Sequence, residues 1–250
     1  MYNEWCGNSK TCITLAQNSV QPDLVLVVDN STKNMNNEAC CAERGWLYHS
    51  MCGNAGLSKA YNAAIRLLDG QTDLVVWADD DTCFPENYFE KLREYARNDT
   101  KADVFLPVVR TQSFIMSPAI YTKRRVVPIR SVDELKGKEI TGINSGLAVR
   151  LRVYQEFHYD EAIFLDCVDH DFLRWCRIHG KKFCVMNDLE LVQSFFSEGK
   201  PSPAARKNRA RIYTRDTRVF DAKCGKSRLL TQWDLLRYWI AVELSCLKNR

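Results

Sequence analysis

Three adjacent aspartates, Asp79, Asp80 and Asp81, directly follow an apolar run at residues 74–78. Carboxylates held this close repel one another unless a cation or water offsets their charge. Carboxylate oxygen is a hard ligand, and it favours Mg²⁺ or Mn²⁺. A solvated acidic turn is the alternative interpretation, and a position at the end of a buried strand disfavours it. The aspartates therefore predict a site for a divalent cation.

A second acidic position ends a similar apolar run. Residues 24–28 read Leu-Val-Leu-Val-Val, and Asp29, Asn30 and Ser31 follow them. Short continuous apolar runs are typical of strands that are buried on both faces of a parallel sheet. Ligands of such sheets bind beyond the carboxyl ends of the strands. We therefore expect Asp29 and the three adjacent aspartates to share one cleft.

Helical and extended segments alternate along the chain. Between the two apolar runs, residues 57–68 have apolar side chains at helical spacing after an entry turn that contains glycine. Further on we expect a helix opened by Pro85, strands at 104–106 and 146–149, and a helix at 171–178. This alternation predicts an α/β fold, an αβα sandwich around a mostly parallel central sheet.

Composition restricts the class of protein. The chain has 250 residues, 46% of them hydrophobic, and a formal net charge of +4, which suits one large or two small globular domains. So small a charge argues against nucleic-acid binding and favours an anionic small molecule or membrane surface as partner. Eleven cysteines without a C-x-x-C pair indicate reduced cytosolic thiols, and their spacing does not suit a structural zinc site.

Five segments together resemble the family 2 glycosyltransferases, which have the Rossmann-like GT-A fold. They are Val27–Ser31 (V-V-D-N-S), Gly53–Asn62 (G-N-A-G-L-S-K-A-Y-N), Ala78–Thr82 (A-D-D-D-T), Ile143–Gly146 (I-N-S-G) and Leu165–Arg174 (L-D-C-V-D-H-D-F-L-R). Each segment alone is weak evidence, but their order and spacing are specific. The resemblance predicts a GT-A domain at 1–225, followed by an amphipathic helical tail at 226–250. Asp-Asn-Ser and Val-Asp-His-Asp-Phe are similar to the bacterial rhamnosyltransferase-like branch.

The resemblance implies a site for a nucleotide-diphosphate sugar donor with Mn²⁺ or Mg²⁺. Asp81 is the expected main metal ligand, and Asp79 is expected to face the ribose or the metal. Asp29 is expected at the nucleobase, with Asn54 and Lys59 near the phosphates. The complete set of expected nucleotide-sugar-binding residues is Tyr2, Asp29, Asn54, Lys59, Asp79 and Asp80.

The resemblance also implies that Asp169 is the general base. It would take the proton of an attacking hydroxyl on a glycan or lipid-linked acceptor, and attack opposite the leaving group would invert the anomeric centre. Asp166, Asp169 and Asp171 precede an expected helix, and any of them could instead cap that helix. Asp171 is the alternative base, and His170 is interpreted as a surface group.

Four further residues, Asn144, Gly146, Asp171 and Arg211, are expected near the acceptor or the diphosphate. Arg211 belongs to the basic segment 206–215, which resembles an Arg-Tyr-rich segment of the family. Its cations could steady a diphosphate or a lipid phosphate. A solvated charged face is the alternative interpretation of this segment.

Two features depart from the family pattern. Related enzymes often have a histidine metal ligand before the basic segment, but residues 193–196, Gln-Ser-Phe-Phe, contain none. Family members also open with an apolar strand that leads into a Tyr-Asn pair, whereas Tyr2 and Asn3 here follow Met1 directly. We therefore expect the sheet to lack its usual first strand, which would leave backbone groups unpaired.

The tail at 228–247 mixes apolar and charged residues. Its large apolar residues are Leu229, Leu230, Trp233, Leu236, Trp239, Ile240 and Leu244. Charges interrupt the segment too often for a bilayer span. It is expected to pack against the domain, or else to attach a cytoplasmic protein to the inner face of the cell membrane through tryptophan and basic residues.

Other functions compete with a metal-dependent hexosyltransferase of polysaccharide biosynthesis. Aspartate-nucleophile phosphatases have D-x-D-x-T after a strand, but Thr82 follows the aspartates directly and Cys83 occupies the fifth position. A nucleotidyltransferase would have a long Gly-rich phosphate loop, which the sequence lacks. A non-catalytic sugar-nucleotide-binding or scaffold protein is the alternative from a different class, and the missing strand and histidine favour it.

Overall fold

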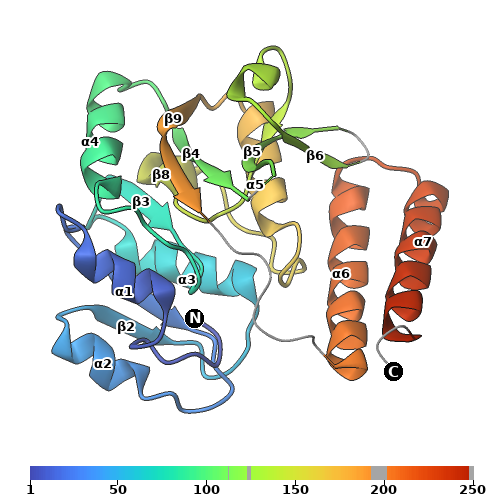
Figure 1. The fold of residues 1–250 in the computed structure, drawn as a ribbon, viewed down its shortest axis with the longest axis horizontal. Coiled ribbons are helices and arrows are strands. Elements are labelled where there is room, and N and C mark those ends of the chain that lie inside the picture. Colours follow the sequence, from blue (N-terminus) through green and yellow to red (C-terminus); the bar gives the residue numbers. More distant parts are fainter. Residues whose placement is uncertain (112, 123–124, 193–201, 248–250) are drawn as a thin grey trace.

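The chain folds around two β-sheets with helices packed on them (Figure 1). The computed structural model describes residues 1–111, 113–122, 125–192 and 202–247. The helices are α1 (Lys10–Gln17), α2 (Asn37–Glu43), α3 (Leu57–Leu68), α4 (Tyr88–Asn98), α5 (Val168–Ile178), α6 (Pro203–Lys223) and α7 (Arg228–Leu247), with 3₁₀ turns η1 (Val132–Leu135) and η2 (Leu151–Gln155). The strands are β1 (Leu26–Asp29), β2 (Leu47–Ser50), β3 (Leu74–Trp77), β4 (Val104–Arg110), β5 (Ile115–Tyr121), β6 (Val126–Ile129), β7 (Ile140–Thr141), β8 (Leu147–Arg150) and β9 (Phe183–Val192).

The strands form a small parallel sheet and a larger mixed one. In the small sheet β1 pairs with β2, and Leu26 lies opposite Leu47. The larger sheet has the order β3-β8-β4-β5-β6, with β7 beside β5 and β9 beside β4. Of its described pairings, β4 with β9 is parallel, and the others are antiparallel. Among the described strands, none joins β1 to β3.

The α/β class is confirmed. The expectation of a mostly parallel sheet is wrong, because most of the described strand pairings are antiparallel. Residues 111–114 join β4 to β5, and a parallel crossover needs about a dozen residues or more. So short a connection can only turn the chain back beside itself. The same holds for the short link between β5 and β6, so this side of the sheet is an antiparallel meander.

Most of the expected elements exist, with shifted ends. The helix expected at 57–68 is α3, with those bounds. The helix expected from Pro85 begins at Tyr88, and that expected from Asp171 begins at Val168. The expected strands at 24–28, 74–78, 104–106 and 146–149 correspond to β1, β3, β4 and β8. The strands β2, β5, β6, β7 and β9 and the helices α1, α2 and α6 are additional.

The central strand β4 divides the core into two layers. Its side chains alternate between the faces of the sheet, as strand geometry requires. Leu106 packs with Trp77 and with Phe172 of α5 on one side. Phe105 packs with Tyr88 of α4 on the other side. All residues of β4 except Arg110 are buried, so this strand is covered by helices on both faces.

The start of α3 is tied to the segment that precedes α5. Gly56 has φ +92°, a conformation that favours glycine. A Cβ at Gly56 would lie 2.5 Å from Cδ2 of Phe164, so a larger residue does not fit. The backbone N–H of Leu57 donates to the carbonyl oxygen of Phe164 at 2.6 Å. The donor-side helix expected from the sequence therefore contacts the loop that leads to Asp169.

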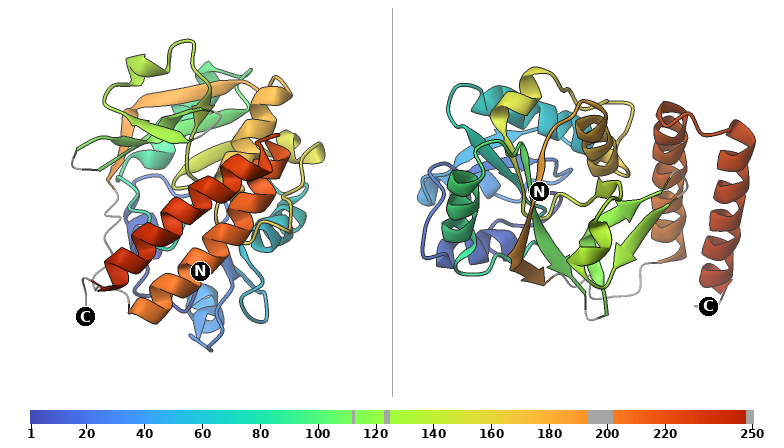
Figure 2. Two further views of the ribbon diagram at one scale, coloured as in Figure 1. Left: turned by 90° about the vertical axis from the view of Figure 1, so that its right-hand side faces the viewer. Right: turned by 90° about the horizontal axis from the view of Figure 1, so that it is seen from above.

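The C-terminal helices α6 and α7 form an antiparallel hairpin beside the α/β body (Figures 1 and 2). Trp239 packs toward α6, where its Nε1 donates to Oγ1 of Thr214 at 2.9 Å, and the rings of Tyr213 and Tyr238 lie 4.4 Å apart. The exposed large apolar residues of α7 are Leu229, Trp233, Leu236, Ile240, Leu244 and Leu247. No helix among the described residues has both the length and the apolar character for a membrane span.

Candidate active site

Asp29 ends β1 as a buried, fully hydrogen-bonded carboxylate. Its Oδ1 accepts from the backbone N–H of Ser31 at 2.9 Å, and its Oδ2 accepts from Nδ2 of Asn37 at 2.9 Å and from the hydroxyl of Tyr48 at 3.2 Å. Burial alone raises the pKa of Asp29, but these hydrogen bonds outweigh burial and lower the pKa below its ordinary value. Asp29 is therefore ionised and held in one position.

The loop before α3 is bound to the end of β1. The side-chain oxygen of Asn30 accepts from the backbone N–H of Ala55 at 3.1 Å, and Nδ2 of Asn30 donates to the carbonyl oxygen of Gly56 at 3.3 Å. Asn54 and Lys59 are exposed on this loop and the first turn of α3. The structure thus brings both residues to the same end of the sheet as Asp29, where a phosphate could reach them.

The turn with Asp79, Asp80 and Asp81 is held by the N-terminal segment. Ser9 Oγ donates to the carbonyl oxygen of Asp80 at 2.7 Å, and Thr11 Oγ1 donates to the carbonyl oxygen of Asp79. The backbone N–H of the exposed Tyr2 donates to Oδ2 of Asp80 at 3.3 Å. Tyr2 therefore lies between the acidic turn and the end of β1.

Ser9 and Thr11 were not among the residues expected at the site. Ser9 is the N-cap of α1 and accepts from the backbone N–H of Cys12. A serine before a short apolar helix is a recognisable start signal. The signal identifies a helix, but its contact with a turn about seventy residues away depends on tertiary packing.

Asp79 faces three other carboxylates. Burial and the negative charges of Asp81, Asp169 and Asp80, in that order, raise the pKa of Asp79 to about 7. Asp79 and Asp169 belong to distant parts of the sequence, yet the charge of Asp169 acts on Asp79. The fold therefore brings the expected base to the same region as the acidic turn after β3.

Buried polar atoms beside this site have no hydrogen-bond partner among the described residues. They include both amide atoms of Asn144 and the hydroxyl of Tyr61. Most buried polar groups in proteins are hydrogen-bonded, so such groups indicate water, an ion or a ligand. Tyr61 also interacts with the charges of Asp79 and Asp169, which places its hydroxyl beside the acidic site. Asn144 was expected near the acceptor or the diphosphate, whereas Tyr61 was not singled out from the sequence.

The three aspartates before α5 have different surroundings. Asp166 forms an ion pair with Arg209, and Asp171 is buried and forms an ion pair with Lys223. Burial raises the pKa of Asp171 in spite of Lys223. The side chain of Asp169 is 22% exposed and accepts from its neighbouring backbone N–H at 2.8 Å. Of the three, Asp169 is the carboxylate whose charge acts on Asp79.

One face of α6 accounts for this difference. Arg209, Asp216 and Lys223 lie at seven-residue intervals, 209 to 216 and 216 to 223, so they share a helix face. Asp216 is fully buried. Its carboxylate accepts from the backbone N–H groups of Phe164 at 3.1 Å, Leu165 at 2.7 Å and Asp166 at 2.9 Å. The helix therefore holds the segment before Asp169 at three points.

The other expected residues lie in different settings. Gly146 has φ +71°, and a Cβ there would lie 2.9 Å from Cδ2 of Leu191, so its position in the core by itself requires glycine. His170 is partly buried, with its Nδ1 2.9 Å from Oγ1 of Thr141, and it is not the surface group that we expected. Arg211 is exposed on α6, and no contact recorded for the described residues joins it to Asp79, Asp81 or Asp169. Residues 193–196 lie outside the described residues.

The residues present fit a cation that is shared with a ligand. Among the described residues, no three His, Cys, Asp or Glu side chains converge on one metal position. Mg²⁺ is usually bound by one or two carboxylates together with substrate phosphates and water. Two carboxylates, Asp79 and Asp81, beside the unpaired amide of Asn144 match that donor set.

Three solved structures with similar folds are glycosyltransferases. A mannosyltransferase from Pyrobaculum calidifontis, in complex with GDP-Man and Mn²⁺, has a TM-score of 0.63 and 17% identity over 94% of this chain and 66% of that chain. Glucosyl-3-phosphoglycerate synthase from Mycobacterium tuberculosis, in complex with Mn²⁺, UDP and phosphoglyceric acid, has a TM-score of 0.59 and 12% identity over 90% and 77%. GalNAc-T7 with UDP, GalNAc and Mn²⁺ has a TM-score of 0.56 and 12% identity over 76% and 41%.

At these identities the likeness concerns the fold, which is the GT-A fold in these neighbours. The chain spans 66% of the mannosyltransferase and 41% of GalNAc-T7. No curated protein matches the chain by sequence. The model of the family described as Glycosyl transferase family 2 matches residues 1–156, a segment with all the expected donor-side residues. The expected resemblance is therefore confirmed, and the chain belongs to glycosyl transferase family 2.

Proposed function

We propose that this protein is a metal-dependent, inverting glycosyltransferase that moves a sugar from a nucleotide-diphosphate donor to a hydroxyl acceptor. The observation that carries the proposal is that the charges of Asp81 and Asp169, from distant parts of the sequence, both act on Asp79 at the end of β3. The unpaired polar atoms of Asn144 and Tyr61 beside this site support a polar ligand there. Family membership supports glycosyl transfer as the class of reaction.

The donor nucleotide binds along the ends of β1 and β3. Asp29 is ionised and fixed by its hydrogen bonds, so a base or ribose donor group meets an acceptor that needs no reorganisation. The side chain of Tyr2 is exposed, and its ring offers a flat surface to the nucleobase. Asn54 and Lys59 line the path toward the phosphates, where the Lys59 ammonium attracts negative charge.

Asp79 and Asp81 hold the cation in this proposal, and Asp80 is fixed by Tyr2 at the edge of the site. Bound Mn²⁺ or Mg²⁺ would neutralise negative charge on the nucleoside diphosphate as it leaves. A cation is favoured there because burial and the charges of Asp81, Asp169 and Asp80 raise the cost of ionising Asp79. Asn144 and Tyr61 supply uncharged donors to the same ligand.

Asp169 acts as the general base. It accepts the proton of the acceptor hydroxyl while that oxygen forms a bond to the anomeric carbon and the bond from this carbon to the diphosphate breaks. Asp171 is less suited, because it is buried against Lys223. Asp166 is less suited, because it is paired with Arg209. Attack on the face opposite the leaving group inverts the anomeric centre.

The acceptor is a glycan or a lipid-linked sugar of polysaccharide assembly, and the protein works in the cytoplasm against an anionic membrane surface. The support for the membrane is the stripe of exposed apolar residues on α7, which includes Trp233 and Leu236 beside the exposed cation Arg237. Arg211, exposed on the adjacent helix α6, is available to a lipid phosphate.

The proposal is tested by binding and turnover with the same panel of donors. Isothermal titration of UDP and GDP is run with Mn²⁺ and with EDTA, and release of nucleoside diphosphate is assayed from GDP-mannose, UDP-glucose and dTDP-rhamnose. Asp81→Asn should weaken nucleotide binding in Mn²⁺ about tenfold or more and abolish the effect of EDTA. Asp133→Asn, at an exposed carboxylate of η1, is the matched control. Equal binding with Mn²⁺, with EDTA and in Asp81→Asn contradicts the metal site.

A non-catalytic sugar-nucleotide-binding protein is the second candidate. The observation that favours it is the separation of β1 from β3, which leaves the donor side of the fold divided. Metal-dependent nucleotide binding without release of nucleoside diphosphate from any donor, in the presence of acceptor extracts, would support this second candidate.

A further inference from the structure

Four buried cysteines lie together on the donor side of the fold. Cys6, Cys12, Cys40 and Cys41 form one cluster with Val27 of β1, and all four are free thiols. Cys6 and Cys41 are fully buried, and the other two are nearly so. The proposed sugar transfer uses none of them. We call these four residues the thiol cluster.

Two members of the thiol cluster are in direct contact. The thiol of Cys6 donates to Sγ of Cys12, with the two sulfurs 3.5 Å apart. A guanidinium N–H of Arg44 donates to the same Cys6 sulfur at 3.6 Å, and the Arg44 guanidinium lies over the ring of Trp46 at 5.0 Å. The sulfurs of a disulfide are about 2.05 Å apart. Cys6 and Cys12 therefore need to approach each other by only about 1.5 Å to form one.

The surroundings of Cys12 favour its thiolate. Cys12 lies in the first turn of α1, where its backbone N–H donates to Oγ of Ser9 at 3.3 Å, and thiols at helix N-termini or near arginine ionise more readily. The hydrogen bond from Cys6 lowers the pKa of Cys12 to about 7 in spite of burial, and Ser9 and the charge of Arg44 act in the same direction. The same hydrogen bond, together with burial, raises the pKa of Cys6. Cys12 is thus the nucleophile of the pair, and Cys6 keeps its proton.

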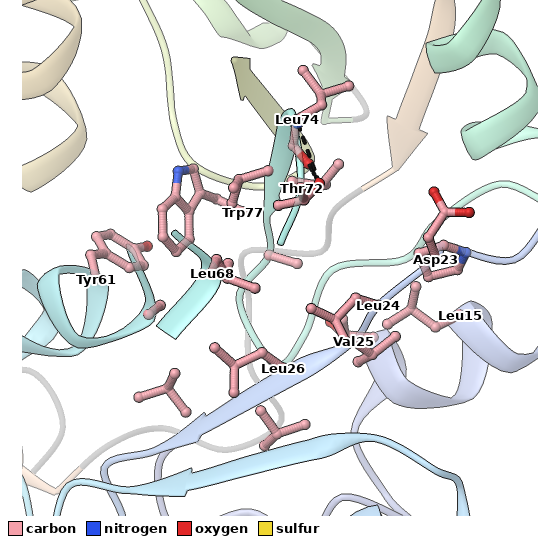
Figure 3. Close-up of a pocket in the computed structure, with 18 of the residues that line it drawn as sticks. Leu15, Asp23, Leu24, Val25, Leu26, Tyr61, Leu68, Thr72, Leu74 and Trp77 are labelled. Carbon is pink, nitrogen blue, oxygen red and sulfur yellow. Dashed lines mark hydrogen bonds between the residues drawn. The ribbon is translucent and has the colours of Figure 1, made fainter. Parts of the chain in front are cut away.

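A short surface segment covers the two thiols. Asn8 and Lys10, between the two cysteines, are exposed. The second turn of α1 is fixed more firmly, because Leu15 is buried and packs near Val25 (Figure 3). Short surface segments open locally at a much lower free-energy cost than the core. Opening of residues 6–12 alone therefore admits a small molecule to Cys12.

We propose that Cys6 and Cys12 are a redox-active pair, which a peroxide oxidises to a disulfide that loosens the acidic turn after β3. The Cys12 thiolate attacks one oxygen of hydrogen peroxide, so that an S–O bond forms, the O–O bond breaks, and the departing hydroxide takes up a proton to become water. The Cys6 sulfur then attacks the Cys12 sulfur. The S–S bond forms, the S–O bond breaks, and the second hydroxide leaves as water with the Cys6 proton. Two thiols are oxidised, and one peroxide is reduced to two waters.

The segment closed by this disulfide holds the acidic turn. Ser9 Oγ donates to the carbonyl oxygen of Asp80 at 2.7 Å, and Thr11 Oγ1 donates to the carbonyl oxygen of Asp79. Both hydroxyl groups belong to residues between the two cysteines. When the sulfurs move together, the first turn of α1 shifts, and these hydrogen bonds weaken.

The thiol pair is also linked to Asp29. The backbone N–H of Cys6 donates to Oδ1 of Asn37 at 2.7 Å, and Nδ2 of Asn37 donates to Oδ2 of Asp29 at 2.9 Å. Oxidation therefore disturbs both acidic positions of the donor side. Its effect on nucleotide binding rests on the proposed function, whereas the disulfide and the loosened turn do not.

Peptide mapping after treatment with hydrogen peroxide tests the pair. Disulfides are mapped by mass spectrometry under non-reducing conditions in the unaltered protein, Cys6→Ala, Cys12→Ala and Cys41→Ala, with dimedone present to trap sulfenic acid. Thermal unfolding of each variant checks that it folds. Cys41→Ala is the matched control, because Cys41 is buried in the same cluster but lies outside the pair.

The unaltered protein and Cys41→Ala should form a disulfide between Cys6 and Cys12 that dithiothreitol reverses. Cys6→Ala should accumulate dimedone adduct at Cys12, and Cys12→Ala should leave Cys6 reduced. The proposal is overturned if the unaltered protein forms no such disulfide, or if Cys6 is oxidised equally well in Cys12→Ala. The first of these results needs no variant, so it holds even where a substitution prevents folding.

Amide hydrogen exchange and nucleotide titration measure the consequence. In the oxidised protein, residues 9–15 and 78–82 should exchange about threefold or more faster than in the reduced protein, and peroxide should not change exchange there in Cys12→Ala. Binding of UDP or GDP in Mn²⁺ should weaken about fivefold or more on oxidation. Unchanged exchange in the oxidised protein overturns the loosening of the turn. If the reduced protein binds neither nucleotide, the proposed function is contradicted, while mapping and exchange still decide the role of the thiol pair.

Discussion

The two sheets differ in how completely they are packed. In the larger sheet, Val104, Phe105 and Leu106 of β4 are fully buried between helices. In the small sheet, β1 alternates between half-buried and buried residues beside a cavity of about 710 Å³. Asp169 belongs to the well-packed part, and Asp29 belongs to the divided part. The proposed base is therefore positioned by core packing and by α6, whereas the donor side is positioned mainly by side-chain hydrogen bonds.

The largest expected effect comes from replacing the proposed base, because this change should affect sugar transfer but not donor binding. Asp169→Asn should lower the rate of sugar transfer about a hundredfold to ten-thousandfold, the usual contribution of a general base. Donor affinity should stay close to that of the original protein, because Asp169 is not among the expected donor contacts. The measurement is steady-state transfer together with titration of the donor nucleotide.

Asp171→Asn is the matched control for the base. It should reduce stability and change transfer much less, because Asp171 is buried against Lys223. If Asp171→Asn stops transfer while Asp169→Asn does not, the two roles are exchanged. If both variants transfer at the original rate, the base lies outside the segment before α5.

The next prediction compares the effect of a Val→Ala substitution in each of the two sheets. Val104→Ala removes two buried methyl groups from β4 and should lower the free energy of unfolding by about 2–3 kcal/mol. Val76→Ala removes the same atoms beside the cavity between β1 and β3, where Val76 is half-buried, and should cost about 1 kcal/mol or less. Urea unfolding of both variants measures the difference. Equal losses would mean that the two sheets are equally well packed.

A smaller effect is expected when the hydrogen bonds between α6 and the segment before Asp169 are weakened. Asp216→Asn keeps the shape of the side chain but weakens its bonds to the N–H groups of Phe164, Leu165 and Asp166. The expected loss is about 1–3 kcal/mol of stability, with a larger decrease in transfer than in donor affinity. The exposed control Asp133→Asn should change stability by less than about 0.5 kcal/mol. If Asp216→Asn transfers sugar at the original rate, α6 does not position the active site.

Local patterns in the sequence were sufficient to predict several elements on the donor side of the fold. The helix at Leu57–Leu68 was predicted with its observed bounds, because its apolar spacing and its glycine turn indicate the same element. The aspartates after β1 and β3 were expected to share a cleft, and this stays a prediction, although the charges of Asp81 and Asp169 do act on Asp79. Strand direction was predicted less well, since the short connections of β5 and β6 decide it and these strands have no distinctive pattern.

Tertiary contacts decided what could not be predicted around α6. The segment 206–215 was interpreted by charge alone, as a solvated face or a phosphate site. Its continuation to Lys223 places Arg209 and Asp216 on one face at seven-residue spacing, and this repeat is a signal that the sequence does contain. Which loop that face would contact depends on packing between segments about fifty residues apart.

The smallest expected effect concerns the exposed stripe of α7. Trp233 is 59% exposed, whereas Trp239 donates to Thr214 of α6, so the two tryptophans of this helix provide a matched pair. Trp233→Ser should weaken binding to vesicles that contain anionic lipid by about tenfold, because burial of an aromatic side chain at an interface contributes roughly 1.5 kcal/mol.

Binding is measured by flotation at low ionic strength and again at high salt, where weaker binding is expected because exposed cations such as Arg237 contribute to it. Trp239→Ser should lower stability through α6 and leave the affinity of the folded protein for vesicles nearly unchanged. If the original protein does not float with anionic vesicles at low salt, the stripe does not bind membranes. If both tryptophan variants lose binding equally, the hairpin as a whole is required and the stripe alone is not the contact surface.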